Sequence, residues 1–109
     1  METATNQSAI YSEFDSDPDM HELVEMFVEE MPERVGTIAN LLAEGDFESL
    51  RYSAHQLKGA VGSYGFHQLT AYAAKVESLL DEKQGEQEIC AAVHELIEQC
   101  QRARVGQGN

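Results

Sequence analysis

The feature that most constrains the fold is the recurrence of apolar residues at helical spacing in four separate blocks. Residues at positions i, i+3, i+4 and i+7 fall on one face of an α-helix, so each block predicts one amphipathic helix. The four stripes are Leu23, Met26, Phe27, Ile38, Leu41 and Leu42; Phe47, Leu50, Ala54, Leu57 and Val61; Leu69, Tyr72, Ala73, Val76, Leu79 and Leu80; and Ile89, Val93, Leu96, Ile97 and Cys100. No strand-like alternation competes with them, so we expect an all-α protein.

The first long helix is bounded by residues that favour helix starts and stops. Asp17 followed by Pro18 is typical of an N-cap with proline in the first turn. Pro32 lies inside the stripe and removes one backbone hydrogen bond, so we expect one kinked helix rather than two separate ones. Gly45 and Asp46 then supply a stop and a new N-cap.

The later connections between helices are short. The second helix should end near the glycine cluster at 62–65, and a polar run at 81–86 separates the third helix from the fourth. Short connections make consecutive helices antiparallel. The predicted fold is therefore an antiparallel up-and-down four-helix bundle with a proline-kinked first long helix.

The chain has 109 residues, which suits a single domain with one modest core. We expect the bundle to span 17–104. Residues 1–16 are predicted to form a partly flexible strap, in which Ile10, Tyr11 and Phe14 can pack as a short leading helix. Residues 105–109 are predicted to be a flexible tail.

The charge of the chain excludes several classes of partner. Twenty acidic and seven basic residues give a formal net charge of −13. This field repels nucleic-acid phosphates and anionic membrane surfaces, so we expect neither nucleic acid nor membrane as a partner. Apolar residues outside the four stripes are too few to indicate a dimer surface, so a monomer is the expectation.

Compartment and redox chemistry follow from two further observations. The sequence has no apolar run long enough to span a membrane and no secretory leader, which favours the cytoplasm. Cys90 and Cys100 lie ten residues apart in one predicted helix, about 15 Å between α-carbons, so they cannot pair within it. The initial Met favours a freestanding protein.

His55 stands out because of its neighbours on the second helix. A rotation of about 100° per residue places it roughly 130° from the centre of the apolar stripe, on the exposed side. Lys58, Gly59 and Gly62 follow at i+3, i+4 and i+7 and share its face. Each helical glycine costs roughly 1 kcal/mol relative to alanine, which indicates that this face needs room beside the imidazole. For Gly62, ordinary helix termination is an equal alternative.

The segment A-H-Q-L-K-G-A-V-G-S-Y-G-F at residues 54–66 resembles the signature of histidine-containing phosphotransfer (HPt) domains. That pattern is a histidine, any residue, an aliphatic residue, lysine and glycine. The M-P-E-R, L-A-E-G-D-F and L-T-A-Y-A-A-K-V-E segments also look like this family, so the resemblance covers roughly residues 20–100. It implies a four-helix bundle that carries a phosphoryl group on an exposed histidine.

The resemblance also implies roles for individual residues. His55 would be the phosphoacceptor, with Lys58 and Gly59 as its companions. Family members often carry Gln or Glu on the next helix, hydrogen-bonded to the other imidazole nitrogen, and the matching position is Glu77. A carboxylate that accepts from Nδ1–H fixes the tautomer in which the Nε2 lone pair points outward as the nucleophile. An ordinary solvated Glu is the alternative for Glu77.

The implied partners are receiver domains of a hybrid histidine kinase and of a response regulator. The chain would act as a phosphorelay intermediate, accepting the phosphoryl group from an aspartyl phosphate of one receiver and passing it to another. Lys58 would offset phosphoryl charge, and Tyr52, Gly59 and Gly62 would lie at the docking surface. No phosphate-binding loop is present, so we expect no kinase activity. No cofactor is expected in this chain, since the Mg²⁺ for transfer would be bound by receiver carboxylates.

Two rival functions come from other classes. A di-iron bundle enzyme would need Glu-x-x-His pairs, and no Asp or Glu precedes a histidine by three residues, so no metal site is expected. A non-catalytic acidic helical-bundle adaptor explains the stripes and the charge. The adaptor hypothesis does not explain why Lys58, Gly59 and Gly62 share a helix face with His55. His21, His67 and His94 have no similar neighbours and receive no role.

Overall fold

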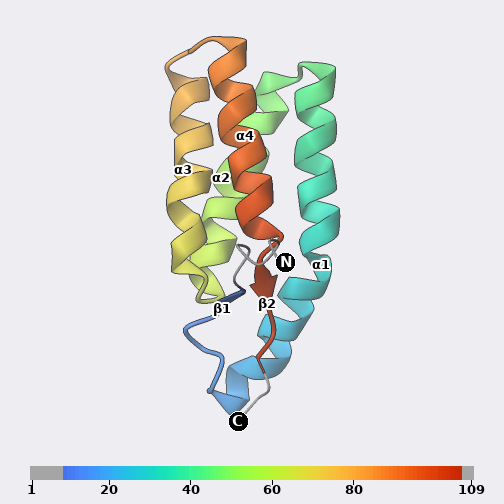
Figure 1. The fold of residues 1–109 in the computed structure, drawn as a ribbon, viewed down its shortest axis with the longest axis vertical. Coiled ribbons are helices and arrows are strands. Elements are labelled where there is room, and N and C mark those ends of the chain that lie inside the picture. The colour runs from blue at the N-terminus through green and yellow to red at the C-terminus, as the bar shows by residue number, and fades with distance from the viewer. Residues whose placement is uncertain (1–8, 107–109) are drawn as a thin grey trace, which may run out of the picture.

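The computed structural model describes residues 9–106 and consists of four α-helices standing side by side (Figure 1). They are α1 (Pro18–Glu44), α2 (Phe47–Ser63), α3 (His67–Asp81) and α4 (Glu86–Cys100). Each helix packs on the next along the chain, and α4 returns to pack on α1. The predicted all-α four-helix bundle with up-and-down order is confirmed.

The ends of the helices follow from local sequence chemistry. The side chain of Asp17 accepts a hydrogen bond from the backbone N–H of Asp19 at 2.9 Å, and Asp46 accepts from that of Ser49 at 3.2 Å. These bonds satisfy backbone donors that a helix start leaves without partners. Gly45 ends α1 in the left-handed conformation, with φ of 72°, which glycine adopts without steric cost.

Helix α1 runs without interruption through Pro32. Figure 1 shows that its first half slants across the base of the molecule, whereas its second half runs alongside the other helices. A change of direction near its middle is what an internal proline produces, because the ring removes a hydrogen bond and crowds the preceding turn. One continuous helix forms here, as the apolar pattern on both sides of Pro32 predicts.

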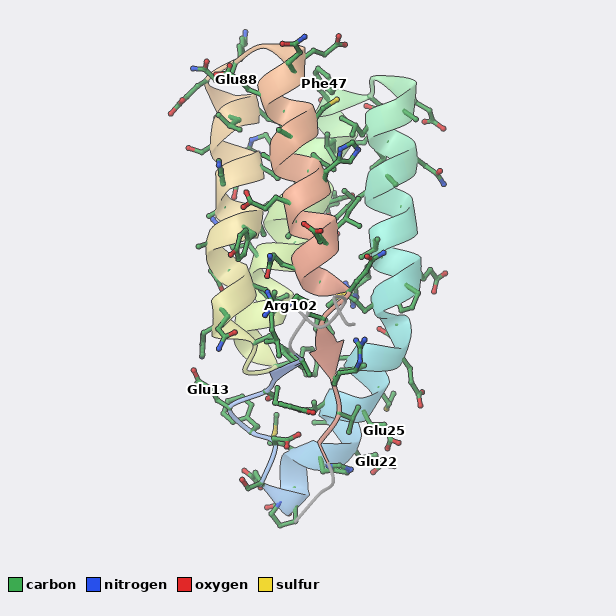
Figure 2. The ribbon with its side chains drawn as sticks, in the orientation of Figure 1. Glu13, Glu22, Glu25, Phe47, Glu88 and Arg102 are labelled. Carbon is green, nitrogen blue, oxygen red and sulfur yellow. The ribbon has the colours of Figure 1, made fainter. Side chains whose placement is uncertain are left out.

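The buried face of α1 differs from the prediction at its N-terminal end. Leu23 and Met26 were expected in the core but are exposed, with 44% and 51% of their surface accessible. The buried residues repeat every three or four positions: Val24, Phe27, Met31, Val35 and Ile38. Leu23 and Met26 each precede a member of this series by one residue, about 100° around the helix, and so fall beside the core rather than in it. Glu22 and Glu25 project outward from the same part of α1 (Figure 2).

The other three helices bury most of the residues that their spacing predicts, whereas the predicted Phe47, Tyr72, Leu79, Leu80 and Ile97 are only partly buried against the core. Phe66, between α2 and α3, is fully buried and lies near Phe27, with ring centroids 5.8 Å apart. Phe27 also stacks on Tyr64 at 4.6 Å. The buried residues of α2, α3 and α4 are Leu50, Ala54, Leu57 and Val61; Leu69, Ala73, Val76 and Glu77; and Ile89, Ala92, Val93, Leu96 and Cys100. Among these, Glu77 is the one charged residue.

The segment before α1 forms a strap across the base of the bundle. In place of a short leading helix, it has the strand β1 (Ile10–Tyr11), which pairs in parallel with β2 (Ala103–Arg104). Strands of two residues leave no alternation in the sequence to recognise. Ser12 is buried and donates a hydrogen bond from Oγ to the backbone carbonyl of Tyr64 at 2.6 Å, which ties the strap to the α2–α3 connection.

The two chain ends are only partly described. Residues 1–8 of the predicted strap and 107–109 of the predicted tail lie outside the described residues. Within the described part, the backbone N–H of Gly106 donates to Asp15 Oδ1 at 2.8 Å. No helix among residues 9–106 has the length and apolar character needed to cross a membrane.

Candidate functional site

His55 lies in the middle of α2, on the side of the helix that faces away from the core. The core face of α2 carries Leu50, Ala54, Leu57 and Val61, whereas the His55 side chain is 58% exposed. The rotation between these two faces is the one that the apolar spacing of α2 predicts. The imidazole is therefore attached to a rigid helix and open to other molecules.

Glu77 approaches the imidazole from α3. Its Oε2 lies 2.9 Å from His55 Nδ1, although the Glu77 residue is only 8% exposed. Lys58 holds the pKa of Glu77 below its ordinary value of 4.5, His55 acts in the same direction, and burial opposes both. An ionised carboxylate can only accept, so this contact favours the tautomer with the proton on Nδ1. In that neutral tautomer, Nε2 bears the lone pair on the side of the ring away from Glu77.

Lys58 also turns toward Glu77. Its Nζ lies 2.9 Å from Oε1, so the two carboxylate oxygens contact two different groups, lysine on one side and histidine on the other. The sequence suggests that the Lys58 ammonium lies near the glycine face, where it would offset phosphoryl charge. In this structure the ammonium pairs with the Glu77 carboxylate on that side of the imidazole.

Two further charged residues complete the site, and sequence analysis missed both. Arg51 donates from Nε to Oδ1 of Asp81, the last residue of α3, and its Nη2 lies 3.4 Å from Asp81 Oδ2. The same Nη2 is 3.4 Å from Glu77 Oε2. Each ion of the pair holds the other charged: the Asp81 pKa is lowered, chiefly by the hydrogen bond from Arg51, and the Arg51 pKa is raised, chiefly by that to Asp81.

A signal for Arg51 was present in the sequence. It precedes His55 by four residues and so shares its helix face, just as Asp81 follows Glu77 by four on α3. We call these five residues the charged cluster: Arg51, His55, Lys58, Glu77 and Asp81.

The two glycines of the His55 face leave open space beside the cluster. A Cβ added at Gly59 would meet nothing within 4 Å. At Gly62 it would meet Thr70 Oγ1 at 3.9 Å, an ordinary contact. Gly62 lies inside α2, and the left-handed residue after the helix is Gly65, with φ of 84°. Helix termination therefore requires Gly65, and neither Gly59 nor Gly62 is required by the packing of this chain.

Tyr52 lies one turn before His55 and is 62% exposed. Its hydroxyl accepts a hydrogen bond from Gln56 Nε2 at 3.0 Å. The three residues that the sequence suggests for a docking surface, Tyr52, Gly59 and Gly62, thus occupy the same helix as His55 on both sides of the imidazole.

The two cysteines do not form a second reactive site. Cys90 and Cys100 are both free thiols, and burial raises the pKa of Cys100 to about 12, which keeps it protonated and unreactive. Over residues 9–106, no group of three or more His, Cys, Asp or Glu side chains is arranged to hold a metal ion.

The fold and the site define a class of protein: a helical bundle that presents one oriented histidine on a small, glycine-lined face. The family model described as Hpt domain matches residues 22–105, which is most of the chain. The chain therefore belongs to the Hpt domain family, whose members act in phosphotransfer within two-component systems and interact with receiver domains. No match is found among curated proteins or among solved structures.

Proposed function

We propose that His55 is the phosphoacceptor of a phosphorelay intermediate. It accepts a phosphoryl group from the aspartyl phosphate of one receiver domain and passes it to an aspartate of another. The observation that carries this proposal is the contact between His55 Nδ1 and the ionised Glu77 carboxylate, combined with the exposure of the ring. Together they leave Nε2 as an unprotonated nucleophile that faces outward.

The transfer step follows from this arrangement. The Nε2 lone pair attacks phosphorus, the N–P bond forms, and the bond from phosphorus to the aspartyl oxygen breaks, so the receiver aspartate leaves as a carboxylate. The proton on Nδ1 stays in place, and the phosphorylated ring therefore carries positive charge next to Glu77. A fixed carboxylate at 2.9 Å stabilises that charge. Passing the group onward reverses these steps on another receiver.

The surroundings of His55 suit an acidic partner site. A receiver site binds Mg²⁺ through carboxylates, so the Mg²⁺ that assists transfer belongs to the partner. Two of the seven basic residues of this acidic chain, Arg51 and Lys58, lie in the charged cluster. They offset the charges of Glu77 and Asp81 at the place where the partner must approach. The bare surface at Gly59 leaves space for that approach.

The adaptor hypothesis remains the second candidate, and it makes no use of the site. It explains an apolar core with an acidic surface, but an adaptor needs no ionised Glu77 at the edge of the core. A single test separates the two functions. The purified chain is incubated with a phosphorylated receiver domain and Mg²⁺, and phosphate that is acid-labile and base-stable is located by intact and fragment mass spectrometry.

We expect phosphate at His55, lost in His55→Gln and retained in the matched control His94→Gln, which removes an exposed histidine of α4. Because the His55 side chain is largely exposed, His55→Gln should leave the bundle folded. Absence of phosphate with each of several receivers would favour the adaptor.

A further inference from the structure

The interface between α2 and α3 is crossed by two successive polar pairs. Arg51 lies one turn before His55, and Asp81 lies one turn after Glu77. Because α2 and α3 run antiparallel, the Arg51–Asp81 pair lies directly beside the His55–Glu77 pair. Within residues 9–106, no hydrogen bond or ion pair joins Arg51 or Asp81 to the imidazole, and Asp81 interacts with His55 only through longer-range charge. The direct contact between the two pairs is that of Arg51 with Glu77 Oε2.

Arg51 is held in a definite orientation by its partner. Its guanidinium contacts both oxygens of Asp81, a two-point arrangement that restricts rotation of the group. In this orientation Nη2 lies 3.4 Å from Glu77 Oε2, the same oxygen that accepts the proton of His55 Nδ1.

The Glu77 carboxylate is consequently held from two sides. Lys58 lies 2.9 Å from Oε1, and Arg51 is the cation next to Oε2. If Lys58 were the only cation, the carboxylate could rotate and bring both oxygens toward the ammonium, which would draw Oε2 away from the imidazole. A second cation on the Oε2 side opposes that rotation.

We infer that Arg51, anchored by Asp81, is a positioning residue that keeps Glu77 Oε2 aimed at His55 Nδ1. This role deepens the proposed phosphoacceptor function and rests on it for its biological meaning. It acts through Glu77 and selects the tautomer of His55 with the nucleophilic Nε2 outward.

If the Arg51–Asp81 pair only joined α2 to α3, its removal would leave the tautomer of His55 unchanged. The side chains of Arg51 and Asp81 are 46% and 49% exposed, and exposed ion pairs contribute little to the free energy of unfolding. The chain offers a matched pair for comparison: Lys75 of α3 and Glu95 of α4 lie 3.8 Å apart, with 59% and 46% exposure. Removal of either pair should leave the melting temperature nearly unchanged.

The test measures the tautomer of His55 by ¹⁵N NMR of the imidazole at a pH where the ring is neutral, in the full chain. In the parent protein, the tautomer with the proton on Nδ1 should dominate. In Arg51→Met its fraction should fall, and the rate of phosphorylation by a receiver should fall about tenfold, the lower end of the usual effect of losing a supporting contact. Lys75→Met should leave both unchanged, and Arg51→Lys should recover part of each. An unchanged tautomer in Arg51→Met would overturn the inference.

A charge exchange separates positioning from simple attachment of the two helices. The double variant Arg51→Asp with Asp81→Arg keeps an ion pair between α2 and α3 but places a carboxylate next to Glu77 Oε2. We expect its Nδ1–H fraction to be no higher than that of Arg51→Met. Restoration to the parent value would show that Arg51 only joins the helices. The NMR measurement needs no phosphate donor, so failure of phosphorylation in the parent would refute the proposed function without deciding this point.

Discussion

The interface between α2 and α3 and the interface between α1 and α4 are built from different chemistry. The first carries the charged cluster, whose contacts run between specific atoms. The second borders a largely apolar groove of about 420 Å³. Its lining residues are Val28, Met31, Pro32, Val35 and Gly36 of α1 with Cys100, Gln101, Ala103 and Arg104. Polar contacts depend on direction and apolar contacts on area, so changes at the first should alter chemistry and changes at the second should alter stability.

The largest effect is expected from shortening an apolar side chain at the α1–α4 interface. Met31 is 3% exposed, and Met31→Ala removes buried apolar surface and enlarges the space around it. We expect a loss of about 2–5 kcal/mol in the free energy of unfolding, measured by urea titration. The rate of His55 phosphorylation, measured well below the unfolding midpoint, should stay within about twofold of the parent, which is under 0.5 kcal/mol. A large fall in that rate would show that the two interfaces are coupled.

Replacement of Glu77 should mainly lower the rate of His55 phosphorylation. Glu77→Met keeps the length of the side chain but removes the acceptor for His55 Nδ1–H. Loss of such a supporting contact should lower the phosphorylation rate about 10–100-fold. Glu77→Gln keeps an oxygen acceptor and should lose less. Equal rates in Glu77→Met and the parent, from single-turnover transfer with a receiver, would remove Glu77 from the mechanism.

A glycine within a helix lies near each interface, and the two form a matched pair: Gly59 on the exposed His55 face of α2, and Gly36 of α1 at the groove. A Cβ at Gly59 or Gly36 meets nothing within 4 Å, so side chains fit at both positions. Gly59→Glu should slow transfer from a receiver about tenfold or more, because bulk and negative charge then occupy the approach to His55. Gly36→Glu adds the same group at the α1–α4 groove and should leave transfer unchanged.

The alanine variants serve as folding controls for this pair. Gly59→Ala and Gly36→Ala should each raise the free energy of unfolding by roughly 0.5–1 kcal/mol, because both relieve the cost of glycine within a helix. If Gly59→Glu and Gly36→Glu slowed transfer equally, the effect would be one of net charge, and the glycine face would not be a docking surface.

The smallest expected effect is a difference in pH dependence. The folded pKa of Glu77 lies below its ordinary value of 4.5, so ionised Glu77 contributes stability that is present above that value and lost as the pH falls through the lowered pKa. Melting temperatures followed from about pH 6 to about pH 3 should therefore show the parent losing stability relative to Glu77→Gln. The difference in melting temperature between Met31→Ala and the parent should change little over this pH range. If the difference in melting temperature between the parent and Glu77→Gln stayed constant over this range, the lowered pKa assigned to Glu77 would be wrong.

Comparison of individual residues shows where sequence reasoning succeeds. Asp17 and Asp46 cap helices through contacts within three residues, and the core stripe of α2 follows from spacing alone. Reasoning failed where the outcome depended on distant parts of the chain. Leu23 and Met26 have helical spacing, but only the packing of α1 decides which of two adjacent faces is buried. The pairing of β1 with β2 joins the two ends of the described chain and has no local signature.

The charged cluster shows the same division. The sequence by itself determined that α2 is a helix and that Arg51, His55, Lys58 and Gly59 share its outer side, because these relations depend only on the 3.6-residue period. The family resemblance suggested Glu77 as the partner of His55, which the spacing within α2 could not do. Only the tertiary structure decided that Asp81 stands opposite Arg51 and that Lys58 and Arg51 contact different oxygens of the Glu77 carboxylate. The physical reason is that the alignment of α2 against α3 is set by how their buried side chains interlock, an outcome of the whole core.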